Sequence, residues 1–403
     1  MTISTGESGH GSAAARAYAV RVAIFYAAVF LVAGAQMPFL PVWLDWNGLT
    51  ASEISVVAAV PLIVRIIVTP AFAFLADRHG DHRLALIALS WAGFAMLLLL
   101  TRAGGFWPIL ISATLFALFW TSVMPLTETI ALNGVRRAGL DYGRMRIWGS
   151  ISFIAASFGG GFILEWTGNA FAIWLIVAGG LATVIGAHLL PQPGSLPNTT
   201  AGAAASATAR KGLRLDEALA LLSNRAFLTF LLAVGSIQAA HAVIYTYGTL
   251  HWQSQKITSA TAGMLWTIGV IAEIMLFAWS KAIVARLGPM LLIAIGGVAA
   301  VVRWTIMAFD PPVALLVPLQ ILHALTFGAT HLGAVHHIAA TISERQGATA
   351  QAVTAAVTAG IAMGGATLLS GRFYEAFQGR AYLAMAALGA IGLAAALVLR
   401  RAR

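Results

Sequence analysis

The chain of 403 residues is 60% apolar and only 9% charged, whereas a soluble domain carries about 25% charged residues. So few charges cannot coat a globule of this size in water, which excludes an ordinary soluble protein and leaves lipid as the solvent. The net charge of +10 does not indicate a nucleic-acid-binding protein, because the basic residues lie in short breaks between apolar runs and form no single patch.

The chain has no cysteine, which excludes a disulfide, a thiolate metal site and a thiol nucleophile. Residues 1–17 are rich in small and polar side chains and are expected to form a disordered amino-terminal segment. The apolar run after them is too long for the core of a signal peptide and has no clear cleavage site. We therefore expect it to be the first membrane-spanning helix.

Twelve segments are long and apolar enough to cross a bilayer, which needs about 20 apolar residues per helix. Backbone groups in lipid must form their hydrogen bonds within the protein, and no alternation typical of barrel strands is present, so the segments are predicted to be helices. The predicted spans are 18–43, 52–76, 83–101, 106–131, 146–165, 170–189, 226–250, 259–280, 288–308, 312–336, 349–371 and 380–399.

The longest polar break, 191–224, divides these spans six and six. It begins with Pro191-Gln192-Pro193-Gly194 and contains the basic residues Arg210, Lys211 and Arg214. This plan is typical of two similar bundles joined by a loop. We therefore predict an amino-terminal bundle over 18–190, a linker over 191–224 and a carboxyl-terminal bundle over 225–403.

The basic residues also predict the orientation, since cytoplasmic loops carry an excess of Lys and Arg. With the amino terminus inside, the inner segments hold 17 of the 24 Lys and Arg residues, the outer loops hold 4 and the spans hold 3. This bias predicts that both termini and the 191–224 linker are cytoplasmic.

Ionisable residues within a span are costly and usually functional. Here they are Arg65, Glu128, Arg146, Glu273 and Arg303. Arg146 lies near a helix start, where a side chain can also snorkel to the interface. For Arg65, a structural ion pair and a functional role stay equally open. A buried Glu128 is expected either to join an ion pair or to carry a proton.

Two polar stripes lie on otherwise apolar spans. They are Gln238, His241 and Tyr245 on span seven and Gln320, His323, Phe327 and His331 on span ten. Histidine titrates near physiological pH, which suits a proton relay, although an intramembrane histidine can also be a hydrogen-bonded packing residue. No metal-ligand spacing is evident, and no phosphate-binding Gly-Lys loop occurs, so ATP-driven transport is not expected.

Three segments resemble the major facilitator superfamily. Residues 73–83, AFLADRHGDHR, are similar to the superfamily's signature between helices two and three. The resemblance implies that this segment is a gating loop, formed by Asp77, Arg78, Gly80 and Arg83. Residues 34–44, GAQMPFLPVWL, resemble the end of helix one in the lactose permease branch. Residues 141–150, DYGRMRIWGS, resemble the entry to helix five of that branch and are closer still to the 3-phenylpropionate permease group.

The resemblance implies an all-α membrane protein with twelve transmembrane helices in two six-helix bundles. It matches Glu128 and Arg146 to the carboxylate and arginine of the branch's sugar site, and Arg303 and His323 to a coupling arginine and histidine. Glu273 lies about one turn from the branch's helix-eight carboxylate. Three positions depart from the pattern: Phe153 replaces a stacking Trp, Thr326 replaces the proton-carrying Glu, and Gln320 replaces a Lys. A galactoside substrate and the standard coupling residue are therefore not expected.

We expect a secondary active transporter of a bacterial inner membrane, not an enzyme. It takes up a small organic solute with protons, an aromatic carboxylate being the leading substrate class. The proton gradient supplies the energy without a cofactor or metal, and the protein acts as a monomer. The expected substrate-binding residues are Glu128, Arg146, Trp120, Phe153, His241, Tyr245 and Trp266, and the expected coupling residues are Glu273, Arg303 and His323.

Other functions stay open at this point. A sugar or nucleoside symporter and a drug or metabolite exporter use the same architecture, and aromatic residues in spans are also common as lipid-facing or interfacial packing. A non-transporting sensor or assembly factor belongs to another class, but a scaffold need not retain charges within its spans.

Overall fold

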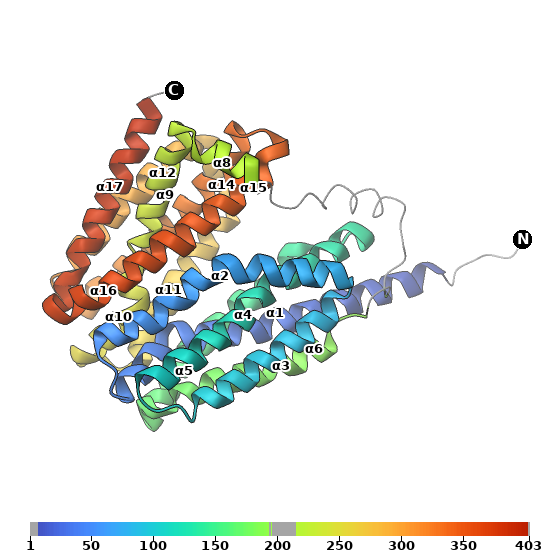
Figure 1. Cartoon of the computed structure of the whole chain (residues 1–403), viewed down its shortest axis with the longest axis horizontal. Coiled ribbons are helices and arrows are strands. Elements are labelled where there is room, and N and C mark those ends of the chain that lie inside the picture. The colour runs from blue at the N-terminus through green and yellow to red at the C-terminus, as the bar shows by residue number, and fades with distance from the viewer. Residues whose placement is uncertain (1–6, 193–194, 196–214, 402–403) are drawn as a thin grey trace, which may run out of the picture. The chain divides into compact units, whose positions relative to one another are not determined.

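The computed structural model describes residues 7–192, 195 and 215–401, and the secondary structure of these residues is helical throughout (Figure 1). The helices of the amino-terminal half are α1 (Glu7–Trp46), α2 (Ala51–His79), α3 (His82–Leu100), α4 (Phe106–Ala138), α5 (Tyr142–Thr167), η1 (Asn169–Phe171) and α6 (Ala172–Leu189). Those that follow are α8 (Leu215–Leu222), α9 (Arg225–Ala239), α10 (Ala242–Ser254), α11 (Ser259–Ala278), α12 (Ser280–Met307), α13 (Val313–Ile321), η2 (Ala324–Ala329), α14 (Thr330–Thr341), α15 (Glu344–Ala355), η3 (Ala356–Ala362), α16 (Met363–Phe377), η4 (Gln378–Ala381) and α17 (Tyr382–Arg401).

Within the described residues, eleven helical stretches are long and apolar enough to cross a membrane. Ten of them each correspond to one predicted span, although four of these spans were predicted to extend one or two residues beyond the helical stretch. The eleventh, Arg345–Arg401, has 57 residues and contains both of the last predicted spans. The turn between those two spans is itself helical, because η4 continues directly from α16 into α17. The twelve predicted spans are therefore all present.

Several helices differ from their predicted bounds. α1 begins at Glu7, inside the segment 1–17 expected to be disordered, where Ala13, Ala14 and Ala15 favour helix. α12 begins at Ser280 but bends at Gly288, which has a φ of 71°, a backbone conformation that favours glycine. The predicted start of this span at residue 288 coincides with the bend.

The predicted linker is partly described. Its last part forms α8, where Glu217 accepts hydrogen bonds from Nε of Arg345 and Oγ1 of Thr349, both at 3.3 Å. These contacts anchor α8 on α15. Arg210, Lys211 and Arg214 lie outside the described residues.

The chain groups into two compact units. Unit 1 comprises Met1–Gln36, Ile67–Ala156 and Ile173–Lys211, and unit 2 comprises Met37–Ile66, Ser157–Ala172 and Gly212–Arg403. Unit 2 thus includes short pieces of the amino-terminal half as well as the whole predicted carboxyl-terminal bundle.

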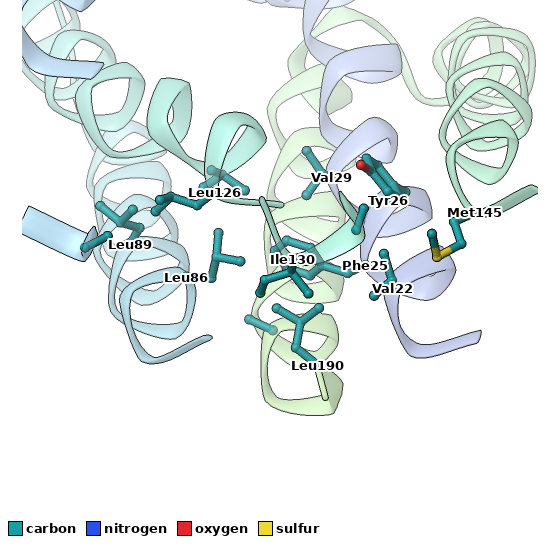
Figure 2. Packing of buried hydrophobic residues seen from close by; sticks show 14 of the residues in the cluster. Val22, Phe25, Tyr26, Val29, Leu86, Leu89, Leu126, Ile130, Met145 and Leu190 are labelled. Carbon is teal, nitrogen blue, oxygen red and sulfur yellow. The ribbon is translucent and has the colours of Figure 1, made fainter. Parts of the chain in front are cut away.

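The core of unit 1 is built by the apolar faces of α1, α3, α4, α5 and α6. Figure 2 shows this cluster, in which Phe25 and Tyr26 of α1 pack near Ile130 of α4 and Leu190 after α6. In unit 2, α12 and α9 both pack along α17 (Figure 1). Gly392 on α17 lets α9 approach closely, since a Cβ atom there would lie 2.6 Å from Cγ1 of Ile237.

Hydrogen bonds explain why unit 2 includes the start of α2 and the end of α5. The Tyr247 hydroxyl donates to the carbonyl of Ala51 at 2.6 Å, and Ser52 bonds to Glu375. At α5, the backbone amide of Ala260 donates to the carboxylate of Glu165 at 3.3 Å. All of these groups belong to the ends of helices that the sequence predicts to face outward.

Candidate functional site

Glu273 and His323 form a close pair within the helices of unit 2, which is an ion pair when the histidine is protonated. Glu273 is on α11, and His323 lies directly before η2. The Nε2 atom of His323 is 3.2 Å from Oε2 of Glu273, and the side chains are 13% and 20% exposed respectively. A Cβ atom at Gly269 would lie 3.4 Å from the histidine Cβ, in van der Waals contact, so α11 passes close to His323 at this glycine. The structure therefore brings together two of the three residues predicted to couple protons.

Arg303, the third of these residues, has neutral partners. It lies on α12 and is 1% exposed. One guanidinium nitrogen donates to Oγ1 of Thr326 at 3.1 Å and the other to Oε1 of Gln320 at 2.7 Å, while its Nε has no hydrogen-bond partner among the described residues. The guanidinium also lies 4.4 Å from the Trp304 ring. A buried cation is costly without an anion, so Arg303 is suited to bind one.

His241 completes a hydrogen-bond chain that begins at Arg303. Its Nδ1 lies 3.0 Å from the carbonyl of Gln238, and its Nε2 lies 2.9 Å from Oγ1 of Thr326. A carbonyl only accepts, so Nδ1 carries the proton, and Nε2 of the neutral ring accepts from the Thr326 hydroxyl. That hydroxyl in turn accepts from Arg303. The neutral tautomer of His241 thus satisfies both ring nitrogens and the Thr326 hydroxyl, which assigns His241 a positioning role here.

Aromatic rings surround this network. His323 stacks on Phe327 with a centroid distance of 5.4 Å, and Tyr245 stacks on Trp266 at 6.1 Å and on His241 at 5.3 Å. The indole Nε1 of Trp266 donates to Oγ1 of Thr249 at 3.0 Å, which fixes the ring. Three predicted substrate-binding residues, His241, Tyr245 and Trp266, therefore lie together beside the ion pair, where flat rings offer stacking surfaces for an aromatic solute.

Irregular helices position these groups. Span seven breaks between α9 and α10 at His241, which exposes the Gln238 carbonyl to the imidazole. Span ten widens into the π-helix η2 immediately after His323, and span eleven into the π-helix η3. Such π segments are frequent at functional sites.

A second cluster lies in unit 1 and contains Glu128 and Arg146. The Glu128 carboxylate interacts electrostatically with the hydroxyls of Tyr26 and Tyr142. The Arg146 guanidinium lies 4.1 Å from the Phe30 ring and 5.7 Å from the Tyr26 ring, a cation–π arrangement. Among the described residues, Arg146 makes no salt bridge with Glu128. Its guanidinium rests instead on the aromatic rings of α1.

The other two predicted substrate-binding residues of unit 1 serve packing. Trp120 is partly buried against the core cluster and lies 5.3 Å from the Phe116 ring. Phe153 is buried, and its backbone carbonyl closely faces Gly34 of α1. Both residues therefore have a structural role.

Arg65 binds a backbone carbonyl. In unit 2 its guanidinium donates to the carbonyl of Ala359 at 2.9 Å, within η3. The neighbouring Gly360 leaves room for Ile66, because a Cβ atom on residue 360 would lie 2.5 Å from the Ile66 side chain. Arg65 therefore clamps α2 to a π-helix.

The residues of the predicted gating loop take several positions between α2 and α3. Gly80 has φ of 71°, which favours glycine in this turn. Arg83 donates from Nε to the carbonyl of Leu190 at 3.0 Å and from a terminal nitrogen to that of His188 at 2.8 Å, so it caps α6. Arg78 is exposed, and the side chain of Asp77 lies outside the described atoms.

The sequence did not indicate a polar cluster around His251. Its Nε2 lies 2.8 Å from Oδ1 of Asp310 and its Nδ1 lies 3.1 Å from the hydroxyl of Tyr374, whose ring stacks on Tyr247 at 4.3 Å. Gly379 covers the pair, since a Cβ atom there would strike both side chains. The only signal was a histidine near the end of span seven, and Asp310 is distant in sequence. In the described part of the chain, no three His, Cys, Asp or Glu residues are arranged to hold a metal ion.

Comparisons with known proteins agree with this architecture. Residues 19–384 match the sequence profile described as the MFS_1 like family. The chain is 30% identical over 368 residues to an Escherichia coli (strain K12) protein named "Probable 3-phenylpropionic acid transporter", covering 88% of this chain and 90% of that protein. It is 26% identical over 385 residues to the maltose permease of Geobacillus stearothermophilus, covering 94% and 93%.

Solved structures are similar in fold. The crystal structure of the nucleoside transporter NupG superposes with a TM-score of 0.80 at 18% identity, covering 95% of this chain and 99% of that one. A bacterial homologue of the lysosomal transporter Spinster, in an inward-facing and occupied conformation, gives a TM-score of 0.71 at 12% identity, covering 95% and 96%. These similarities confirm the predicted major facilitator fold.

Proposed function

The chain belongs to the MFS_1 like family, and we propose that within it this protein takes up a small aromatic carboxylate together with protons. It is a multi-pass membrane transporter for a small solute and not an enzyme. The proton coupling, the substrate class and the site residues are the proposal.

The Glu273–His323 pair supports proton coupling. Two titratable side chains 3.2 Å apart bind protons as a unit, so the pair can load a proton in one conformation and release it in another. Thr326, which stands where the lactose permease branch has a proton-carrying Glu, cannot titrate and instead bonds Arg303 and His241. The proton is therefore assigned to the pair and not to the position of Thr326.

Two arginines support an anionic substrate. Arg303 has only neutral hydrogen-bond partners among the described residues, and Arg146 rests on the Phe30 ring. We assign solute binding to Glu128 and Arg146 in unit 1 and to the aromatic group Tyr245 and Trp266 in unit 2. The 30% identity to a protein named for 3-phenylpropionic acid favours an aromatic carboxylate over other anions.

The cellular setting is part of the same proposal. The excess of basic residues in the inner segments supports an orientation with both termini cytoplasmic, and the bacterial relatives support a bacterial inner membrane. The proton gradient is proposed as the energy source without a cofactor, and the acting form as a monomer.

A sugar or nucleoside symporter is the second candidate, favoured by the identity to a maltose permease. Uptake of radiolabelled 3-phenylpropionate, maltose and uridine into proteoliposomes with an alkaline interior separates the candidates. We expect 3-phenylpropionate alone to enter faster than in protein-free vesicles, which correct for passive entry of the neutral acid. Faster entry of maltose or uridine only would overturn the substrate class.

Arg146 provides the test of the binding site. Arg146→Ala should weaken binding of 3-phenylpropionate by about tenfold or more, since a charge-assisted contact is worth about 1.5–3 kcal/mol. Arg144→Ala is the matched control, because Arg144 is exposed two residues earlier on the same helix. Equal affinities of the two variants would remove Arg146 from the site.

A further inference from the structure

A polar cavity lies in unit 1, apart from both clusters assigned to transport. Its volume is about 160 Å³, enough for about five waters. It is formed by Tyr18 of α1, the turn between α2 and α3, the last turns of α4 and the residues after α6. None of these residues has a role in the proposed transport of solute or proton except the turn residues Gly80 and Arg83.

Hydrogen-bond donors dominate the lining. Arg83 and Arg137 contribute two guanidinium groups, and Asn133, Gln192 and Ser195 contribute neutral donors. The amide oxygen of Asn133 already accepts from Arg136 at 2.6 Å, which leaves its NH₂ group as the part available for a ligand.

The one lining carboxylate is already engaged. Oδ1 of Asp81 caps α3 by accepting from the backbone amide of Leu84 at 2.9 Å. Arg83 is held by the carbonyls at the end of α6. Arg137, by contrast, makes no hydrogen bond or ion pair with any residue of the described chain, so its donors are available to a ligand in the cavity.

We propose that this cavity binds a phosphate-bearing anion, supplied either by an anionic phospholipid headgroup or by a soluble phosphate. A tetrahedral anion with several acceptor oxygens matches donors that converge from three segments, the α2–α3 turn, α4 and the residues after α6, and arginine binds such oxygens in bidentate fashion. The lining residues lie at the ends of predicted spans, which is the level of lipid headgroups. Basic pockets between helices on the cytoplasmic side are suited to such headgroups.

Bound phosphate would link the end of α4 to the turn between α2 and α3 and to the residues after α6, and should therefore raise the melting temperature. The test uses the purified full chain and two variants with the same charge change. Arg137→Gln alters the cavity, whereas Arg144→Gln removes an exposed arginine that does not line it. Gln192→Ala, beyond the end of α6, is a second cavity variant that leaves every helix unchanged.

Two arms distinguish the sources. Thermal unfolding is followed in neutral detergent with inorganic phosphate against chloride of equal ionic strength, and in phosphatidylcholine vesicles with and without phosphatidylglycerol. We expect at least one probe to raise the melting temperature of the wild type and of Arg144→Gln. The same probe should bind Arg137→Gln with an apparent affinity about tenfold weaker than the wild type. It should also bind Gln192→Ala more weakly than the wild type. A response to phosphatidylglycerol alone identifies a lipid headgroup, and a response to phosphate identifies a soluble ligand. No response of the wild type to either probe, or equal responses of the cavity variants and Arg144→Gln, would overturn the proposal.

Discussion

Replacing Glu273 by Gln should uncouple solute transport from the proton gradient. The substitution keeps the size of the side chain and removes its ability to exchange a proton. At 3.2 Å and an effective dielectric constant near 20, the attraction between the Glu273 carboxylate and a protonated His323 is about 5 kcal/mol before desolvation costs. This interaction energy exceeds the 1.36 kcal/mol that corresponds to one pKa unit, so protonation of one group depends on the other. The two groups therefore act as one proton-binding unit, which Glu273→Gln removes.

The expected effect on accumulation follows from the charge carried. A carboxylate anion that moves together with one proton carries no net charge, so the pH difference alone drives its transport. At equilibrium, the solute concentration inside exceeds that outside by about tenfold for each unit of pH difference. The wild type should reach this ratio across one pH unit faster than protein-free vesicles, and Glu273→Gln should show no carrier-dependent accumulation. Counterflow, the exchange of labelled for unlabelled solute, should persist in the variant because exchange needs no net release of a proton.

Both quantities are measured in the same proteoliposomes, with Glu53→Gln as the matched control. Glu53 caps the start of α2, where its carboxylate accepts from the Thr50 amide at 2.8 Å, so the same chemical change there should preserve accumulation. His323→Gln should behave like Glu273→Gln. If Glu273→Gln still accumulates solute and an uncoupler collapses the gradient, Glu273 is not the proton carrier. If counterflow is lost as well, Glu273 belongs to binding or folding.

Three further predictions concern packing and topology. Thr326→Val should destabilise the protein by about 2–4 kcal/mol, because a buried guanidinium and an imidazole lose their shared partner. Thr267→Val should be neutral or stabilising in the same melting experiment, since the buried Thr267 hydroxyl has no hydrogen-bond partner in the described chain; equal losses would refute the role of the hydrogen-bond chain. Gly392→Ala should cost about 1–3 kcal/mol, because its Cβ would lie 2.8 Å from the carbonyl of Ala233, whereas Gly365→Ala meets open space and should not lower the melting temperature. Ser206→Cys should react only with reagents that reach the cytoplasm, and labelling from outside alone would reverse the predicted orientation.

Hydropathy was sufficient to predict the helical spans. It averages over about 20 residues and is insensitive to the hydrogen-bond register within a helix. For this reason the break at His241 and the π-helix after His323 were not predicted, although both position the site.

The sequence also indicated which charged residues lie within spans, but not their partners. Arg303 was grouped with Glu273 and His323 as a coupling residue, but its hydrogen bonds go to Thr326 and Gln320, while His323 contacts the carboxylate. Arg146 was matched together with Glu128 to one binding-site pattern, and in the structure its guanidinium lies on the Phe30 ring. Contacts between helices depend on helix rotation and on neighbouring aromatic rings, neither of which spacing along one helix determines.

Simultaneous recording of solute entry and internal pH in wild-type proteoliposomes tests proton coupling most directly. The external and internal pH start equal, 3-phenylpropionate is added outside, and protein-free vesicles correct for passive entry of the acid. The account predicts that about one proton enters with each carrier-transported solute, so that the lumen becomes acidic in proportion to uptake. Carrier-dependent entry of the solute without acidification would contradict it.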